Sequence, residues 1–233
     1  MKDYLKKGIN EIGLDISEDK IDKLMEYLKL LIEYNSHTNL TAIRDEEGII
    51  EKHFIDSLLV MKYLGITEGK AIDIGTGAGF PGMVLAICNP NINFTLIDSV
   101  GKKINFLKQV IEKLQLKNVE AINTRAEEFI NDKNRETYDI GLCRGVSKLN
   151  IILEYVIPFL KVDGRFLPQK MEGTNEEKDG ENALKVLKSK IEKIYTEELP
   201  FAKDKRLIID IRKFAKTDKK YPRANGVPAK KPL

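Results

Sequence analysis

Three glycines alternate with small residues directly after a short apolar stretch. Asp73 lies within that stretch, Gly75, Gly77 and Gly79 follow it, and Phe80 comes next. Glycines at this spacing allow a sharp turn and let a ligand approach backbone N–H groups closely. A helix that starts after such a turn adds a partial positive charge, which attracts a polar or anionic group. The run therefore predicts a ligand-binding loop between a strand and a helix, and a turn that only connects two elements is the alternative.

A second interpretation of the same run is a dinucleotide site. The pattern G-x-G-x-x-G occurs from Gly77 to Gly82, and Asp98 follows 21 residues after Gly77. The preceding strand, however, should end at Ile74, so that the turn begins at Gly75 and Phe80 occupies the place of the third glycine. This register argues against a dinucleotide and makes Phe80 an apolar wall of the site.

Carboxylates follow two further strand-like stretches. Asp98 ends the stretch 94–98, where it can accept hydrogen bonds from both hydroxyls of a ribose or cap the next helix. After the stretch 119–123, the backbone of Ala126 and the carboxylate of Glu127 can meet the edge and amino group of an adenine. Alternatively, Glu127 is a first-turn acid that the helix dipole favours. Together these residues predict a cofactor that contains adenosine.

Seven β-type stretches alternate with helical ones from residue 70 onward, which predicts an α/β fold with a doubly wound, seven-stranded sheet. A loop alone separates the last two stretches, so we expect them to pair antiparallel at an edge. The predicted strands are 71–74, 93–97, 119–123, 138–143, 165–168, 193–196 and 207–212, and the helices between them are 80–88, 102–116, 127–131, 150–160 and 176–189.

The chain divides into three predicted parts. Residues 1–69 form a helical cap, with one apolar face that starts after Ser17 as N-cap and another at 46–64. Residues 70–214 form the α/β core, and residues 215–233 form a basic C-terminal tail without regular structure. We expect His53 to be a hydrogen-bonding group of the core and His37 to lie in a loop.

Charge is unevenly distributed along the 233 residues. The total is +3, but residues 212–233 carry +7 and the remainder −4. A basic tail on an acidic body is typical of chains that meet a polyanion, or else it only aids solubility. The start of the chain lacks the apolar stretch of a signal peptide and no run is long enough to span a bilayer, so we expect a cytoplasmic protein. Two cysteines fit neither a disulfide framework nor a metal cluster.

At these residues the sequence resembles class I S-adenosylmethionine-dependent methyltransferases. More narrowly, it is similar to the bacterial small-subunit rRNA (guanine-N7) methyltransferase G family, also called glucose-inhibited division protein B, and the tail resembles that of the Gram-positive members. Two places depart from the family pattern. Gly145 stands where relatives usually have alanine, and Lys170 and Gly173 are separated by two residues where the family usually has a Lys-Gly pair after the fifth strand. The similarity is carried by Tyr34-Asn35, Asn39-Leu40-Thr41, His53, Asp56-Ser57, Asp73 to Gly82, Leu96 to Ser99, Arg125-Ala126-Glu127 and Arg144.

The resemblance implies S-adenosylmethionine as cofactor and N7 of a specific guanine in 16S rRNA as methyl acceptor. Guanine N7 carries a free lone pair, so no general base is needed, and the target guanine must lie in a loop or be flipped out. Arg144, after the fourth strand, is the candidate catalytic residue, through substrate positioning or cofactor contact, with a salt bridge as the alternative. The predicted cofactor-binding residues are Asp73, Gly75, Gly77, Gly79, Phe80, Asp98, Ala126, Glu127 and Arg144.

Basic side chains are the predicted RNA contacts, as sequence-blind phosphate anchors. The resemblance implies 16S rRNA or the small ribosomal subunit as partner, and we expect a monomer without a metal or a required protein partner. The residues concerned are Arg125, Lys102, Lys103, Lys170, Lys219, Lys220, Arg223, Lys230 and Lys231.

Two other functions compete with this one. Cys143 precedes Arg144 and could form the covalent adduct that a pyrimidine-C5 methyltransferase requires, although a lone cysteine at a strand end is more often a packing residue. A non-catalytic RNA-binding protein is the second alternative.

Overall fold

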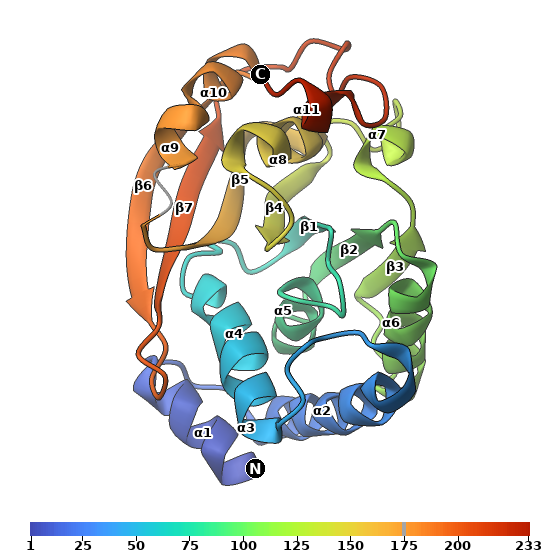
Figure 1. Ribbon diagram of the computed structural model, residues 1–233, viewed down its shortest axis with the longest axis vertical. Coiled ribbons are helices and arrows are strands. Elements are labelled where there is room, and N and C mark those ends of the chain that lie inside the picture. The colour runs from blue at the N-terminus through green and yellow to red at the C-terminus, as the bar shows by residue number, and fades with distance from the viewer. Residues whose placement is uncertain (174–175) are drawn as a thin grey trace.

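The computed structural model describes residues 1–173 and 176–233. Seven strands form one mixed sheet in the order β3-β2-β1-β4-β5-β7-β6 (Figure 1). The first five strands are parallel, β7 is antiparallel to both β5 and β6, and β6 forms the edge, which confirms the predicted sheet. The strands are β1 (Gly69–Ile74), β2 (Ile92–Asp98), β3 (Val119–Asn123), β4 (Tyr138–Arg144), β5 (Leu160–Met171), β6 (Ser189–Glu198) and β7 (Lys205–Lys213).

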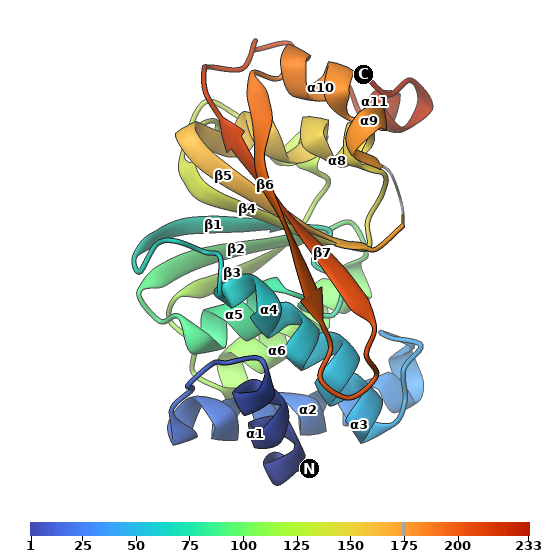
Figure 2. The same ribbon diagram turned by 90° about the vertical axis from the view of Figure 1, so that its left-hand side faces the viewer.

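Helices cover both faces of the sheet (Figure 2). On one face lie α4 (Asp56–Met61), α5 (Gly82–Cys88) and α6 (Gly101–Lys113), and the N-terminal helices pack against them. On the other lie α8 (Leu149–Val156), the 3-10 turn η2 (Ile157–Phe159) and α10 (Glu181–Val186). The short helices α7 (Ala126–Phe129), α9 (Glu176–Asp179) and α11 (Val227–Lys230) complete this second layer.

The N-terminal helices differ in detail from the prediction. The region 46–64 is α3 (Glu46–Ile49), a π-helix η1 (Ile50–Ile55) and α4 in succession. Helix α1 is Lys2–Glu11 and α2 is Glu18–Thr38. Ser17 is the N-cap residue of α2, as predicted, but its hydroxyl donates to the Asp19 carboxylate instead of accepting a backbone N–H. His37 lies in the last turn of α2, not in a loop, because the helix continues to Thr38.

The hairpin of β6 and β7 reaches down to the N-terminal layer (Figure 2). Glu51 of η1 accepts hydrogen bonds from the backbone N–H groups of Phe201 (2.8 Å) and Ala202 (2.6 Å) at the hairpin tip. The Phe201 ring stacks on Tyr4 of α1 with centroids 4.3 Å apart. The first and last parts of the chain are therefore joined directly.

The segment after β7 is folded, so the expectation of an irregular tail is wrong. It contains the one-turn helix α11, buries Tyr221 and Thr217, and packs beside α7 and α8 (Figure 1). Buried or hydrogen-bonded residues lie between its exposed basic residues. The high net charge of the segment gives no sign of these positions in the sequence. No helix in the described part of the chain is long and apolar enough to cross a membrane.

Candidate active site

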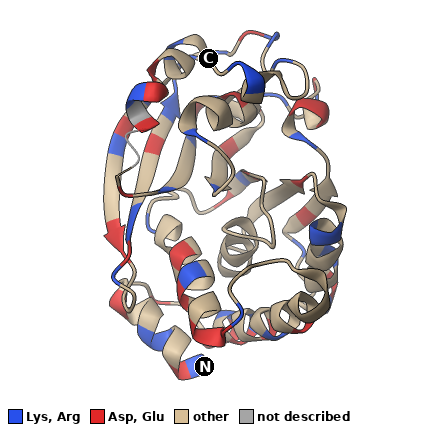
Figure 3. Ribbon diagram, viewed as in Figure 1, with Lys and Arg blue, Asp and Glu red and all other residues tan. Residues whose placement is uncertain are grey.

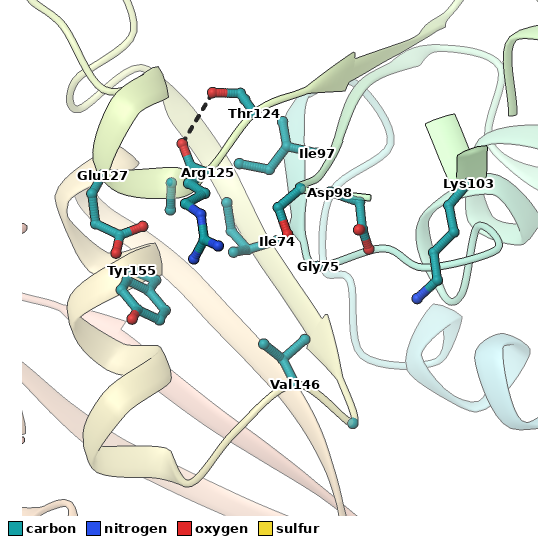
Figure 4. A pocket seen from close by; sticks show the side chains of 13 residues that line it. Ile74, Gly75, Ile97, Asp98, Lys103, Thr124, Arg125, Glu127, Val146 and Tyr155 are labelled. Carbon is teal, nitrogen blue, oxygen red and sulfur yellow. Dashed lines mark hydrogen bonds between the residues drawn. The ribbon is translucent and has the colours of Figure 1, made fainter. Parts of the chain in front are cut away.

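The carboxyl ends of β1, β2, β3 and β4 surround a cavity of about 290 Å³, which we call the cofactor crevice (Figure 4). Parallel strands direct their carboxyl ends to one edge of the sheet, which is where ligands bind in such folds. The lining residues are Ile74, Gly75, Ile97, Asp98, Ser99, Lys103, Thr124, Arg125, Ala126, Glu127, Gly145, Val146 and Tyr155.

The glycine-rich loop forms the floor of the crevice at Gly75. This residue has φ +72°, and a Cβ there would overlap the side chain of Val146 on the β4 loop. Gly145, with φ +66°, borders the crevice, and a Cβ there would have no other atom within 4 Å. An alanine at position 145 would thus meet open space, although it would have to adopt a left-handed conformation.

Asp98 is fixed at the edge of the crevice by the backbone. One carboxylate oxygen accepts the N–H of Gly77 (2.9 Å) and the other accepts the N–H of Val100 (2.8 Å). The two interpretations of Asp98 are compatible in this geometry, because the carboxylate bonds the N–H of Val100 at the start of α6 and still lines the cavity.

Asp73 lies beneath the loop and not in the crevice. It is fully buried and accepts the N–H of Gly82 (2.9 Å), which links strand β1 to the start of α5. Burial raises the pKa of this carboxyl to about 6. The predicted cofactor residues Asp73, Gly77 and Gly79 do not line the crevice: Asp73 supports the loop from below, and Gly77 fixes Asp98 through its N–H group.

Phe80 does not form the apolar wall expected of it. Its ring is buried and stacks on His53 with centroids 4.5 Å apart, and it packs on Tyr27 as well. The N-terminal helices supply these aromatic partners, which sequence spacing alone could not reveal.

Arg125, Ala126 and Glu127 form the far wall of the crevice, where β3 passes into α7. The Ala126 side chain is buried, whereas Arg125 is exposed and extends beside Glu127 and Tyr155 (Figure 4). The Glu127 carboxylate accepts the backbone N–H of Gly226 (3.1 Å). Burial, followed by the nearby Glu127 charge, raises the pKa of Tyr155, so this phenol is protonated at neutral pH.

A second cavity of about 500 Å³, which we call the basic pocket, borders the crevice. Gly145 and Val146 line both cavities and separate them. The other lining residues of the basic pocket are Asp56, Arg144, Ser147, Lys148, Gln169, Lys170, Met171, Glu176 and Arg206.

One buried carboxylate, Asp56, organises the basic pocket. Its Oδ2 accepts from Nη1 of Arg144 (2.9 Å) and from Nε of Arg206 (3.3 Å). Gln169 donates to the Asp56 backbone carbonyl (2.7 Å). Arg144 thus makes the salt bridge considered as its alternative role, and it lines the basic pocket, not the crevice.

His53 is a hydrogen-bonding group of the core, which confirms its prediction. Its Nδ1 lies 2.9 Å from Nη2 of Arg144 and its Nε2 lies 2.7 Å from the Thr41 hydroxyl. Burial and the Arg144 charge lower its pKa to about 3, so the ring is neutral and Nδ1 accepts from the arginine.

The predicted RNA-contact residues of the core lie in different surroundings. Lys102 donates to the backbone carbonyl of Thr38 (2.8 Å), and Lys103 extends toward the crevice. Lys170 lines the basic pocket, where its ammonium group lies 2.6 Å from Glu176.

The predicted RNA-contact residues of the C-terminal segment also differ. Lys219, Lys220, Lys230 and Lys231 are exposed, and Figure 3 shows basic residues at α11 on the outside of the fold. Arg223 is instead bonded to a buried carboxylate of α8.

Cys143 is unsuited to covalent catalysis in this structure. It is buried in β4, and burial raises the pKa of its thiol to about 12. A thiol with this pKa is not ionised near neutral pH, and the thiolate is the nucleophile that pyrimidine-C5 chemistry needs.

Comparison with known proteins supports the methyltransferase class. A model of the family "rRNA small subunit methyltransferase G" matches residues 20–208. The protein named ribosomal RNA small subunit methyltransferase G of Fusobacterium nucleatum subsp. nucleatum is 60% identical over the full length of both chains. That of Acetivibrio thermocellus is 42% identical over 100% of this chain and 97% of its own.

Solved structures share the fold at lower identity. A SAM-dependent methyltransferase from Aquifex aeolicus has a TM-score of 0.54 at 20% identity, over 71% of this chain and 93% of its own. The TYW2 protein of M. jannaschii, solved in complex with AdoMet, has a TM-score of 0.56 at 16% identity, over 75% and 79% of the two chains.

The sheet order and the solved structures show the fold of class I S-adenosylmethionine-dependent methyltransferases. The chain belongs to the rRNA small subunit methyltransferase G family. The expectations of fold, cofactor and enzyme class are thereby confirmed.

Several residues of the two cavities were absent from the predicted site. Gln169 and Arg206 lie one residue outside the predicted strands 165–168 and 207–212, and Tyr155 lies within the predicted helix 150–160, so no motif marked them as site residues. The only signal for Asp56 was its place in the family resemblance.

Proposed function

We propose that this protein transfers a methyl group from S-adenosylmethionine to N7 of a specific guanine in 16S rRNA. The observation that carries the proposal is the common border of the two cavities at Gly145 and Val146. A methyl donor in the crevice and a base in the basic pocket would meet across this border.

The crevice suits the cofactor in shape and chemistry. The fixed Asp98 carboxylate can accept from ribose hydroxyls, and Glu127 with the backbone of Ala126 can meet the adenine. Lys103 extends toward the cavity and can pair with a carboxylate. When bound, the cofactor supplies an electrophilic sulfonium methyl group.

The basic pocket suits a flipped guanine with its phosphates. Guanine presents N7 and O6 as acceptors, and N7 must stay free to attack, so a donor can use only O6. Arg144 and Arg206 are held in place by Asp56, and either guanidinium can serve as that donor. Lys148 and Lys170 line the same pocket and can neutralise phosphate charge.

Catalysis in this arrangement comes from alignment and exclusion of water, because N7 loses no proton when it is methylated. A neutral His53 fits that chemistry: it orients Arg144 and takes no part in proton transfer. The residues of the chain bind, orient and desolvate the reactants.

We also propose that the protein acts as a cytoplasmic monomer on rRNA or on the small subunit, with Lys102, Lys103, Arg125, Lys170 and the exposed lysines of the C-terminal segment near phosphates. Light scattering during size-exclusion chromatography should give the mass of one 26.5 kDa chain. A dimer would contradict it.

The activity is tested with radiolabelled S-adenosylmethionine and small subunits that lack the modification. Borohydride and aniline cleave RNA at 7-methylguanosine, so label and cleavage should map to one guanine of 16S rRNA. If no label enters the RNA, the proposal that the protein is an rRNA methyltransferase fails. If the label is on a cytosine and is lost with the Cys143→Ala variant, the protein is a pyrimidine-C5 methyltransferase instead.

A further inference from the structure

Residues 217–233, which we call the C-terminal clasp, join two walls of the cofactor crevice. Helix α7 carries Glu127 and helix α8 carries Tyr155, and both side chains line the crevice. Figure 1 shows α11 of the clasp next to these two helices. The clasp makes hydrogen bonds to both of them.

The clasp is anchored to α8 by Arg223. Its guanidinium donates to both carboxylate oxygens of Glu154, through Nε (2.9 Å) and Nη2 (2.6 Å), and its backbone N–H adds a third bond (2.7 Å). The Glu154 side chain is 0% exposed, so its charge depends on this partner. Glu154 immediately precedes Tyr155 in the helix.

The clasp is bonded to α7 by the turn at its residues 225 and 226. The N–H of Gly226 donates to Glu127 (3.1 Å), and the side-chain amide of Asn225 donates to Glu128 (2.7 Å). Gly226 has φ +76°, a conformation that favours glycine, and this turn directs its N–H to the carboxylate.

Both ends of the clasp are also fixed. Arg135 donates to the backbone carbonyl of Tyr221 (2.7 Å), whose ring is buried, and Arg223 donates to the carbonyl of Lys231 (2.8 Å). Leu233 packs against the core cluster that contains α8. The segment is thus bonded along its whole length.

We propose that the C-terminal clasp is a positioning element of the cofactor site, which orients Glu127 toward the adenine amino group and fixes α8 behind it. The proposal rests on the proposed function, since it assumes an adenosine ligand in the crevice. From its charge alone, the whole segment is expected to contact RNA. In this proposal the inner side of the clasp shapes the cofactor site, and only its outer lysines are available to contact RNA.

The test compares S-adenosylhomocysteine with S-inosylhomocysteine, which lacks the adenine amino group, by calorimetric titration of the full chain. The wild type should prefer the adenosyl ligand at least tenfold, about the effect of one unmatched polar group. Arg223→Ala should weaken adenosyl binding about tenfold and reduce the preference toward one. A merely structural defect would weaken both ligands equally and keep the ratio.

Two further variants keep the test decisive. Gly226→Ala introduces no steric contact within 4 Å but disfavours φ +76°, so it should lower the preference even if Arg223→Ala does not fold. Lys216→Ala removes one exposed positive charge before the clasp and should leave both affinities unchanged.

The possible failures are distinct. If the wild type binds neither ligand, the proposed function fails. If the wild type binds and discriminates, and folded Arg223→Ala and Gly226→Ala discriminate equally well, the clasp has no positioning role.

Discussion

The cofactor crevice and the basic pocket share Gly145 and Val146, yet they are constructed differently. The crevice is built largely from backbone at four strand ends, and its main acid, Asp98, is held by two N–H groups. The basic pocket is built from side chains around Asp56, which bonds Gln169 and Arg206 at separations of 113 and 150 residues. One site therefore follows from the sheet, whereas the other depends on a single carboxylate.

This difference indicates where each site is vulnerable. A loop held by backbone bonds tolerates changes in its side chains but not in its glycines or in the buried group beneath it. A pocket of charged side chains fails when the counter-ion is removed, because the remaining charges are buried without a partner.

The largest effect is expected for Asp56→Asn. Loss of the carboxylate leaves Arg144 with the uncharged partners His53 and the Lys52 carbonyl, and leaves Arg206 with the exposed Asp204. It should lower the free energy of unfolding by about 3 kcal/mol. Methyl transfer should fall by more than about 100-fold, since both guanidinium groups lose their orientation. Urea denaturation and a methylation assay measure the two effects.

Asp204→Asn is the matched control for that prediction. Asp204 lies 3.7 Å from Nη2 of the same Arg206, but its side chain is 44% exposed. An exposed pair should contribute less than about 1 kcal/mol. Equal destabilisation by the two variants would show that Asp56 has no special role in the pocket.

Asp73→Asn tests the support beneath the crevice through its pH dependence. The folded-state pKa of Asp73 is raised to about 6 from 3.8, so this group stabilises the fold most at pH below 3.8, and the contribution is lost as pH rises through 6. The stability of the wild type relative to the variant should therefore fall by about 3 kcal/mol between pH 3.5 and 7.5.

The difference in unfolding free energy between the wild type and Asp73→Asn isolates the titration of the Asp73 carboxyl. His53 titrates in an overlapping range with the opposite sign, because its lowered pKa makes stability decrease as pH falls, but both proteins contain it. Urea unfolding at several pH values gives the difference. A difference that does not change with pH would mean that Asp73 is ionised when buried.

Gly79→Ala and Gly77→Ala compare two glycines of the same loop. At Gly79 (φ +106°) a Cβ would overlap Tyr27 and come within 2.8 Å of Met83 Cβ, so we expect a loss of about 2 kcal/mol. At Gly77 (φ +63°) the nearest atom would be 3.9 Å away, and only about 1 kcal/mol of backbone strain is expected. Thermal unfolding should rank the variants in this order, and the reverse order would contradict the packing described for the loop.

The smallest effect is expected for Cys143→Ala. The thiol is buried in β4 and its pKa is raised to about 12, so methyl transfer to rRNA should stay within about threefold of the wild type. Single-turnover assays measure this directly. Complete loss of transfer in a folded variant would revive the covalent mechanism.

The sequence predicted the sheet and four of the residues that line the crevice, because both depend on local patterns. Gly75, Asp98 and Glu127 each follow a strand whose apolar residues can be recognised, and parallel strands bring such ends together. The salt bridge of Arg144 was predicted as an alternative, but its partner Asp56 and the stacking of Phe80 on His53 could not be predicted, since both partners lie on the N-terminal helices. The clasp was missed because Arg223 looks like one more charge of a basic tail until Glu154 is seen buried beneath it.

The anchored hairpin of β6 and β7 has a consequence for the order of folding. Glu51 holds the hairpin tip, and Arg206 at the start of β7 reaches Asp56 only across 150 residues of chain. Contacts at such separation carry a large loop-closure cost and form after local ones. During synthesis the crevice strands β1 to β4 emerge well before Arg206, but the clasp that bonds Glu127 and α8 emerges after it, so both cavities should reach their final form only when the C-terminal segment has been made.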